Sequence, residues 1–308
     1  MKTIALIFSL FLKSPAWIWK NLGKNNFTRM IWSGIIVALV AFTSVGSILW
    51  TLSRDLPDLD KLKKYEPRLT TRIYDRHGYL LAELFKQQRL IAPLDIIPQH
   101  TIDAIIATED RRFYHHWGMD IIRVFSSAMV NIASFKVKQG ASTITQQLAR
   151  DLYLHKRQTF TRKIREVLTA LQIERNYSKE EILEMYLTQI YFGHGAYGIG
   201  SAARKYFGKT VDSLDLAESA LLAALPKAPG RYSPRFHPER ALKRRNLVLR
   251  GMLKNDFIKS TDYNTAIIHP IELIPQDSKQ ASGIAPYFTE MIRQTISEEG
   301  RRLGFEYL

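Results

Sequence analysis

The sequence predicts a mainly α-helical protein with a small β-hairpin, preceded by one N-terminal transmembrane helix. Three observations carry this prediction: an uncharged apolar run near the N-terminus, a short strand-like segment around Asp75-Arg76-His77-Gly78, and apolar residues at helical spacing over most of the chain after Gln99. With 308 residues and no internal repeat or low-complexity segment, the chain has room for one large domain or two small ones, and the helical pattern favours one. We expect that domain to have two lobes.

The uncharged run covers residues 30–53 and is long enough to cross a hydrocarbon core, which needs about 20 apolar residues. Five Lys and Arg residues precede it, so the positive-inside rule predicts a cytoplasmic N-terminus and export of the rest. Residues 1–29 are then a cytoplasmic or interfacial segment, and the polar residues 54–68 a linker with two prolines. A cleaved signal peptide is the alternative, but this run is longer than the apolar region of a signal peptide.

The amino-acid composition limits which catalytic chemistry and which partners are possible. The chain has no cysteine, which excludes disulfides and thiolate catalysis. Its formal net charge is +15, and no acidic residue precedes Asp55. A basic domain exported beside a bilayer favours an anionic substrate or lipid headgroups as partners. Nucleic acid is not expected as a partner, because the basic domain would lie on the outer side of that membrane.

Local patterns predict the remaining elements. Strand-like residues on both sides of the Asp75–Gly78 turn indicate a β-hairpin over residues 71–85. Apolar residues at helical spacing predict helices over Thr101–Phe113, over Arg162–Asn176 and around Arg244–Met252. A capping box from Ser178 to Glu181 predicts the start of another helix. One more helix is predicted to begin at Asp215 and to end before Pro226. The segment Gly193–Gly198 matches GxGxxG, but it follows a helix, so we expect a glycine-rich turn between helices instead of a dinucleotide site.

Glu109 stands out because it falls in the apolar stripe of the helix predicted over Thr101–Phe113. A glutamate on a buried face loses solvation, and its proton affinity rises unless a cation compensates. Such a residue suits general acid or base chemistry, and the alternative is a structural ion pair with an arginine. Asp110, His115 and His116 crowd the same turn, which favours a functional site.

The segment GASTITQQ, Gly140–Gln147, places hydroxyls and amides behind a glycine. Around it, Lys136–Arg165 contains eight Lys or Arg residues and one acidic residue, Asp151. Donors at this density suit phosphate oxygens, which accept charge-assisted hydrogen bonds. A hydroxyl-capped helix start with a solvated basic face is the alternative.

Glu166 supplies a second carboxylate, 57 residues after Glu109. It can simply pair with Arg162 at i, i+4, which contributes only about 0.3–0.5 kcal/mol on an exposed helix. Set among cations, it is instead expected to stay ionised while Glu109 takes up a proton more readily. Two carboxylates whose pKa values are separated in this way are what glycosidic chemistry uses.

Five motifs of this chain resemble those of the peptidoglycan glycosyltransferases, the lipid II polymerising domain of class A penicillin-binding proteins. EDRRFYHHWGMD, GASTITQQLAR, RKIRE, KEEILEMYL and RRNLVL occur in that family's order and spacing, from about Leu69 to Leu253. The resemblance implies a lysozyme-like, two-lobed fold over residues 69–255, with a small, partly membrane-embedded jaw at Met119–Val137. Residues 256–308 resemble the start of a linker to a transpeptidase. Because no Ser-x-x-Lys occurs in the sequence, the chain is either monofunctional or a truncated bifunctional enzyme.

By resemblance, Glu109 corresponds to the family's general base and Glu166 to its second acidic residue. The positions that match its substrate-binding residues are Asp110, Phe113, His116, Ser142, Gln146, Gln147, Arg150, Arg157, Arg162 and Lys163. The sequence departs from the family at three positions: Ala141 replaces a glycine, Thr188 an asparagine and Gln158 a basic residue for which the neighbouring Arg157 can substitute. These departures bear on efficiency more than on reaction type.

The implied function is polymerisation of lipid II into β-1,4-linked glycan strands, with release of undecaprenyl diphosphate on the periplasmic side of the inner membrane. The implied partners are lipid II, the nascent strand, membrane lipids and cell-wall synthesis proteins. No cofactor is obligatory and no metal ligand is assigned, although Mg²⁺ or another divalent cation has a place at the diphosphate.

Two alternatives stay open beside this function. One is a lysozyme-like glycan-cleaving enzyme, for which the basic stretch Lys136–Arg165 has no use because a neutral glycan needs no diphosphate site. The other is a non-catalytic membrane-anchored scaffold, against which the presence of both Glu109 and Glu166 argues.

Overall fold

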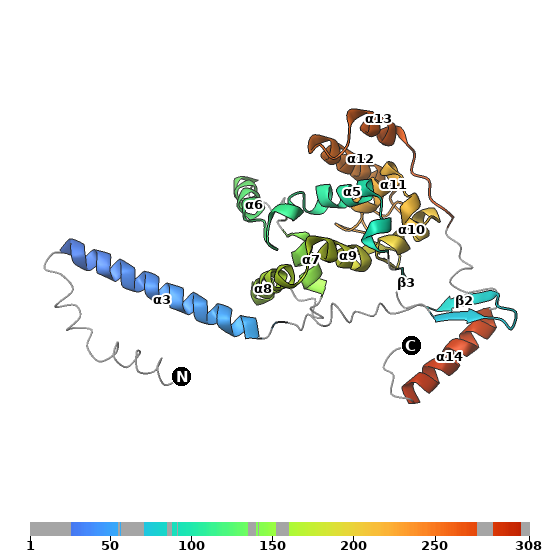
Figure 1. Cartoon of the computed structure of the whole chain (residues 1–308), viewed down its shortest axis with the longest axis horizontal. Helices are drawn as coiled ribbons and strands as arrows, with labels where there is room; N and C mark the ends of the chain where they lie inside the picture. The colour runs from blue at the N-terminus through green and yellow to red at the C-terminus, as the bar shows by residue number, and fades with distance from the viewer. Residues whose placement is uncertain are drawn as a thin grey trace. The chain divides into compact units, whose positions relative to one another are not determined.

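The computed structural model describes residues 26–54, 56, 71–84, 88–90, 92–134, 140, 142–151, 160–275 and 286–302. The chain divides into two compact units, residues 1–56 and 57–308. In the first unit, helix α3 covers Asn26–Arg54 (Figure 1). Among the described residues, however, no helix has both the length and the apolar character that crossing a membrane requires. The structure therefore does not support the transmembrane helix that the sequence predicts over residues 30–53.

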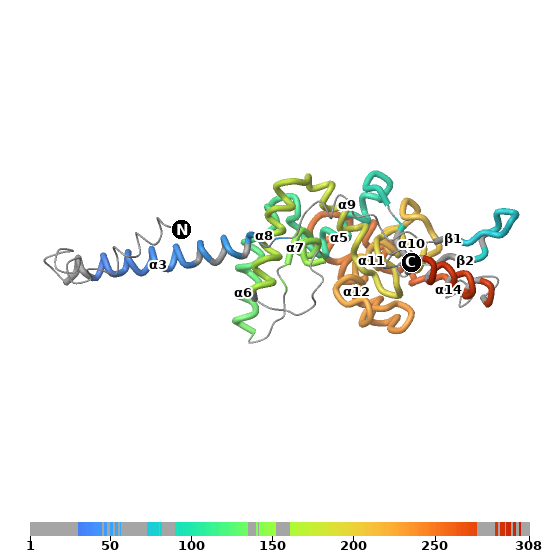
Figure 2. Tube along the Cα trace, turned by 90° about the horizontal axis from the view of Figure 1, so that it is seen from below, coloured from blue at the N-terminus to red at the C-terminus, as the bar shows by residue number. Residues whose placement is uncertain are grey.

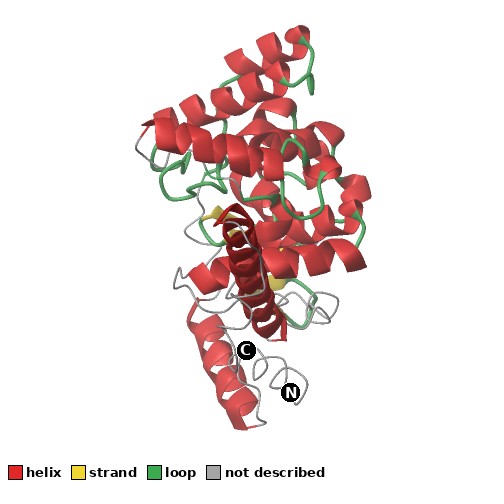
Figure 3. Cartoon of the chain, turned by 90° about the vertical axis from the view of Figure 1, so that its left-hand side faces the viewer, coloured by secondary structure: helices red, strands yellow, loops and turns green. Residues whose placement is uncertain are grey.

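The second unit is mainly helical, as the sequence predicts (Figure 3). Its strands are β1 (Thr71–Tyr74), β2 (Leu80–Leu84), β3 (Gln88–Arg89), β4 (Tyr191–Gly193) and β5 (Ala196–Tyr197). Its α-helices are α5 (Gln99–Glu109), α6 (Ile121–Ser134), α7 (Ile144–Asp151), α8 (Phe160–Asn176), α9 (Lys179–Gln189), α10 (Ile199–Phe207), α11 (Leu216–Ala224), α12 (Pro238–Lys254), α13 (Ser260–Ile268) and α14 (Pro286–Arg302). Three short 3-10 helices are η1 (Leu94–Ile96), η2 (Phe113–His115) and η3 (Val211–Ser213).

The predicted β-hairpin is present. Strands β1 and β2 pair antiparallel, with Thr71 opposite Leu84. The turn is held by Asp75, whose Oδ1 accepts hydrogen bonds of 2.8 Å from the backbone N–H groups of His77 and Tyr79. This side-chain-to-backbone pattern is why aspartate favours turns. Helix α14 lies beside β2.

A second sheet was not predicted. It has three strands in the order β3-β5-β4, with β3 parallel and β4 antiparallel to β5. The segment Gly193–Gly198 thus forms a small hairpin in this sheet, which corrects the prediction of a simple turn between helices. Strands of two or three residues are too short to show an alternating pattern.

Gly198 joins β5 to α10 at a φ of 82°, and a Cβ atom there would lie 2.6 Å from the backbone oxygen of Thr188. Gly198→Ala combines a strained backbone with a main-chain clash, so we expect it to lower the free energy of unfolding by roughly 2–3 kcal/mol. Chemical denaturation measures this loss. Gly195→Ala is the control, because Gly195 has a φ of 78° but no atom within 4 Å of the added Cβ. Equal losses for the two variants would show that the clash contributes nothing.

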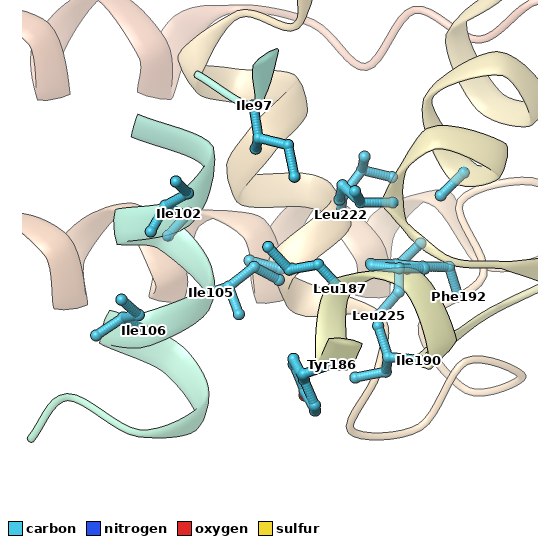
Figure 4. Packing of buried hydrophobic residues seen from close by; sticks show 14 of the residues in the cluster. Ile97, Ile102, Ile105, Ile106, Tyr186, Leu187, Ile190, Phe192, Leu222 and Leu225 are labelled. Atoms are coloured by element: carbon cyan, nitrogen blue, oxygen red, sulfur yellow. The ribbon is translucent and has the colours of Figure 1, made fainter. Parts of the chain in front are cut away.

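The hydrophobic core forms around α11. This helix begins after Asp215, as the sequence predicts. The structure adds a capping box between Asp215 and Glu218, and nearly every residue from Ala217 to Ala224 is buried. A helix that is apolar all round needs neighbours all round, and α11 contacts α5, α10, α12 and α13. Figure 4 shows part of this core, where Ile105 of α5 and Leu187 of α9 meet near Leu222.

Helices α6, α7 and α8 gather at one end of this unit, and α10, α11 and α12 lie farther from that end (Figures 1 and 2). Helix α5 runs from the core toward the first group and ends at Glu109, not at Phe113 as predicted. The chain turns at Asp110, with φ −158° and ψ 74°, and Phe113 lies on η2 with its ring in the core. The apolar spacing therefore continues across a break in the helix, which periodicity alone does not reveal.

Candidate active site

Glu109 is the last residue of α5 and is partly buried. Its Oε2 accepts a hydrogen bond of 2.9 Å from Nε2 of Gln147 on α7. The Tyr186 hydroxyl on α9 donates in turn to Oε1 of Gln147 at 3.4 Å. Burial, together with the nearby charge of Glu109, raises the pKa of Tyr186 well above its ordinary value, so this hydroxyl keeps its proton. Residues of α5, α7 and α9 thus form a chain of hydrogen bonds that ends at the Glu109 carboxylate.

Asp110 ties the end of α5 to the beginning of α7. Its side chain is fully buried, and its Oδ2 accepts 3.0 Å from the backbone N–H of Ile144 and pairs with Nε2 of His116 at 2.9 Å. A carboxylate at a helix N-terminus satisfies an N–H group that has no partner in the helix. Arg123 of α6 donates to the backbone oxygen of Glu109. The residues on both sides of the turn are therefore fixed by hydrogen bonds.

Phe113 and His116, which follow Glu109 in the chain, are buried. Phe113 has no exposed surface and His116 is 7% exposed. Lys179 places its Nζ 4.5 Å from the centre of the Phe113 ring and donates to the backbone oxygen of His116 at 2.6 Å. Of the substrate-binding positions that the resemblance implies, Asp110 and His116 are buried and pair with each other, and Phe113 packs in the core.

The second carboxylate, Glu166 on α8, is 2% exposed. Lys163 Nζ lies 3.0 Å from one of its oxygens and Arg162 Nε lies 3.3 Å from the other. A carboxylate so buried needs paired cations to offset its lost hydration. Lys163 Nζ also donates to Ser142 Oγ at 3.1 Å and to Gln146 Oε1 at 3.2 Å. Three predicted residues, Ser142, Gln146 and Glu166, therefore contact the amine of Lys163.

Helix α7 links the two carboxylates through consecutive residues. Gln147 contacts Glu109, whereas Gln146 contacts Lys163, which holds Glu166. Successive residues of an α-helix point about 100° apart, so neighbouring amides can face two different partners. Gln146 is held in place because its Nε2 also donates to the backbone oxygen of Gly118 at 3.2 Å.

Two predicted site residues remain, Arg150 and Arg157. Arg150 is exposed in the last turn of α7. Arg157 lies outside the described residues, as do Ala141 and Gln158, where the sequence departs from the family, and much of the basic stretch 136–165.

Two contributors were not predicted, Tyr186 and Arg123. The spacing of α9 marks Tyr186 only as part of its inner face, and nothing in the sequence points Arg123 toward Glu109.

The described part of the chain contains no group of three or more His, Cys, Asp or Glu side chains that could hold a metal ion. Around Lys163 the available groups are a hydroxyl, an amide and Glu166, which already lies beside two cations. Mg²⁺ favours carboxylate and water oxygens, whereas this set suits an anion. These residues do not by themselves fit a divalent cation.

Comparison with known proteins identifies the family of the chain. The family model described as "Transglycosylase" matches residues 77–253. "Penicillin-binding protein 1A" of Aquifex aeolicus is 44% identical over 273 residues, which are 89% of this chain and 37% of that protein. The protein of the same name from Escherichia coli is 42% identical over 258 residues, or 84% of this chain and 30% of that protein.

A crystal structure of Penicillin-Binding Protein 1A from Haemophilus influenzae is 29% identical, with a TM-score of 0.47, and the match covers 78% of this chain and 25% of that one. The chain spans about a third of the length of the curated relatives it matches. Since the family model extends over more than half of the chain, from the turn of the β-hairpin to the end of α12, the chain belongs to the transglycosylase family.

Proposed function

We propose that this chain is a peptidoglycan glycosyltransferase that polymerises lipid II into β-1,4-linked glycan strands and releases undecaprenyl diphosphate. The observation that carries the proposal is the contrast between two carboxylates joined through α7. Glu109 is held by a neutral amide, whereas Glu166 lies between two cations. Membership of the transglycosylase family and the similarity to penicillin-binding proteins 1A support it.

In this mechanism Glu109 is the general base. It removes the proton from the 4-hydroxyl of the incoming lipid II sugar, and that oxygen attacks the anomeric carbon of the growing strand. The bond from this carbon to the diphosphate breaks with inversion, and the bonding electrons leave with the diphosphate. Gln147 fixes the carboxylate so that the base and the hydroxyl meet without reorganisation.

Lys163, Arg162 and Ser142 would receive the departing diphosphate. Lys163 is 47% exposed at its side chain, so its amine can reach a ligand while it contacts Glu166. Charge-assisted hydrogen bonds from such groups stabilise the negative charge that develops on the leaving oxygen. Glu166 then acts by holding the two cations toward the ligand instead of taking a proton.

The decisive experiment incubates purified protein with labelled lipid II in detergent or liposomes and separates the products by size. We expect strands longer than a dimer, with one undecaprenyl diphosphate released per bond formed. Intact sacculi provide the contrasting substrate, because release of soluble muropeptides would indicate a glycan-cleaving enzyme. A folded protein inactive on both substrates would indicate a scaffold.

We further propose that the reaction takes place at the periplasmic face of the inner membrane, with α6 against the lipid. Ser127 is the only buried residue among the described positions of this helix. Its large apolar side chains are 58–71% exposed: Ile121, Ile122, Phe125, Met129 and Ile132. Moving each from water into lipid contributes roughly 1.5–3 kcal/mol, enough for reversible binding when several act together. The predicted jaw is described as far as Ser134, and residues 135–137 lie outside.

Residues 57–308 are expected to float with anionic liposomes, and Phe125→Asp is expected to lower the bound fraction about tenfold, because a charged group replaces a side chain that enters lipid. Flotation in a density gradient measures this fraction. Phe236→Asp is the matched control, since Phe236 is 69% exposed but lies outside α6. Binding is refuted if the unaltered unit stays with the soluble fraction. It is also refuted if Phe125→Asp lowers thermal stability and leaves flotation unchanged.

A further inference from the structure

Arg123 lies in the first turn of α6 and reaches back to the end of α5. Its Nη1 donates to the backbone oxygen of Glu109 and lies 3.8 Å from Oδ1 of the buried Asp110. Its own backbone N–H donates to Oδ1 of Asp120 at 3.0 Å, which fixes where the side chain starts. The side chain of Arg123 is only 28% exposed. The helix that exposes apolar residues to solvent thus carries one cation in contact with the residue proposed as the base.

The oxygen that Arg123 contacts is one that the helix itself leaves unpaired. The last four carbonyl groups of an α-helix have no intrahelical partner, and Glu109 is the final residue of α5. A guanidinium remains charged at any working pH and is favoured at the negative end of the helix dipole. After Glu109 the chain leaves the helix at Asp110. The position of the Glu109 backbone therefore depends on a residue of another element.

We propose that Arg123 positions the general base by tying the backbone of Glu109 to α6, so that lipid which holds α6 also holds Glu109. The proposal rests on the function proposed above. Arg123 contacts a main-chain oxygen and not the reacting atoms, so it is a positioning residue. Its loss is expected to affect the chemical step more than the binding of lipid II.

The kinetic test uses the full chain with lipid II in liposomes. Arg123→Ala is expected to lower kcat roughly tenfold to a hundredfold, as small misplacements of a catalytic group do, and to leave KM nearly unchanged. Arg123→Lys is expected to restore part of kcat, because an ammonium group still donates to the carbonyl. Arg204→Ala, which removes an exposed arginine of α10, is the control and should behave as the unaltered chain.

Hydrogen exchange gives a readout that does not depend on activity. Liposomes are expected to slow exchange of the backbone amides of residues 106–113 in the unaltered chain. In Arg123→Ala this slowing should disappear although the protein still binds liposomes.

The proposal is overturned if kcat of Arg123→Ala is unchanged, or if the slowing persists in that variant. It is also overturned if kcat and thermal stability fall together with no recovery in Arg123→Lys. If the unaltered chain makes no glycan, the proposed function fails, and the exchange experiment still decides whether Arg123 couples the two helices.

Discussion

Glu109→Gln is expected to lower the rate of glycan polymerisation by about 10²–10⁴-fold, the range for loss of a general base. An amide has nearly the shape of a carboxylate, and its oxygen can still accept the hydrogen bond from Gln147, so the fold should be retained. The variant can bind lipid II but cannot take the proton from its 4-hydroxyl. Initial rates with labelled lipid II at saturating concentration measure the effect.

Glu180→Gln is the matched control for this variant. Glu180 lies in the first turn of α9 and is exposed, and its replacement changes the net charge by the same amount. The control should polymerise at the unaltered rate. If Glu109→Gln does so too, while its circular dichroism matches that of the unaltered protein, Glu109 is not the base.

Arg245→Ala is expected to lower the free energy of unfolding by about 3–5 kcal/mol without any direct effect on chemistry. Arg245 is 1% exposed on α12, and burial lowers its pKa from the ordinary value. Its guanidinium donates to the backbone oxygens of His269 at 2.6 Å and Ile267 at 3.0 Å, at the end of α13. Each hydrogen bond to a charged group contributes roughly 1.5–3 kcal/mol, and its loss leaves the carbonyl unpaired.

Calorimetry of residues 57–308 measures this loss as a decrease in melting temperature of about 6–20 °C for a domain of this size. Lys243→Ala serves as the comparison, since Lys243 is an exposed residue of the same helix and should change stability by less than about 0.5 kcal/mol. A melting temperature for Arg245→Ala as high as that of Lys243→Ala would contradict the structural role of Arg245.

The features that the sequence predicted best are those determined by neighbouring residues. The starts of α9 and α11 follow from capping boxes at Ser178 and Asp215, because cap and partner lie three residues apart. The β1–β2 hairpin is equally local, since Asp75 holds its own turn. The convergence of Ser142, Gln146, Lys163 and Glu166 was expected only through the resemblance, and local patterns do not contain it.

Features that depend on distant contacts were missed. The three-stranded sheet pairs Gln88 with Ala196, far apart in the sequence, and its strands are too short for a pattern. The end of α5 was missed because the apolar spacing continues to Phe113. The ring of that residue packs in the core although the helix ends at Glu109. Tyr186 contacts Gln147 only after α7 and α9 have packed together.

The hydrogen bonds from Tyr186 through Gln147 to Glu109 run in one direction. A phenol that keeps its proton can donate or accept, but an ionised carboxylate can only accept, so the amide that lies between them turns its NH₂ group to Glu109 and its oxygen to the Tyr186 hydroxyl. The NH₂ group of Gln147 therefore always faces Oε2 of Glu109. A carboxyl oxygen that already accepts a hydrogen bond is the poorer place for a new proton. In the proposed mechanism the proton from the sugar hydroxyl is thus delivered to Oε1, so the two oxygens of this carboxylate are not equivalent.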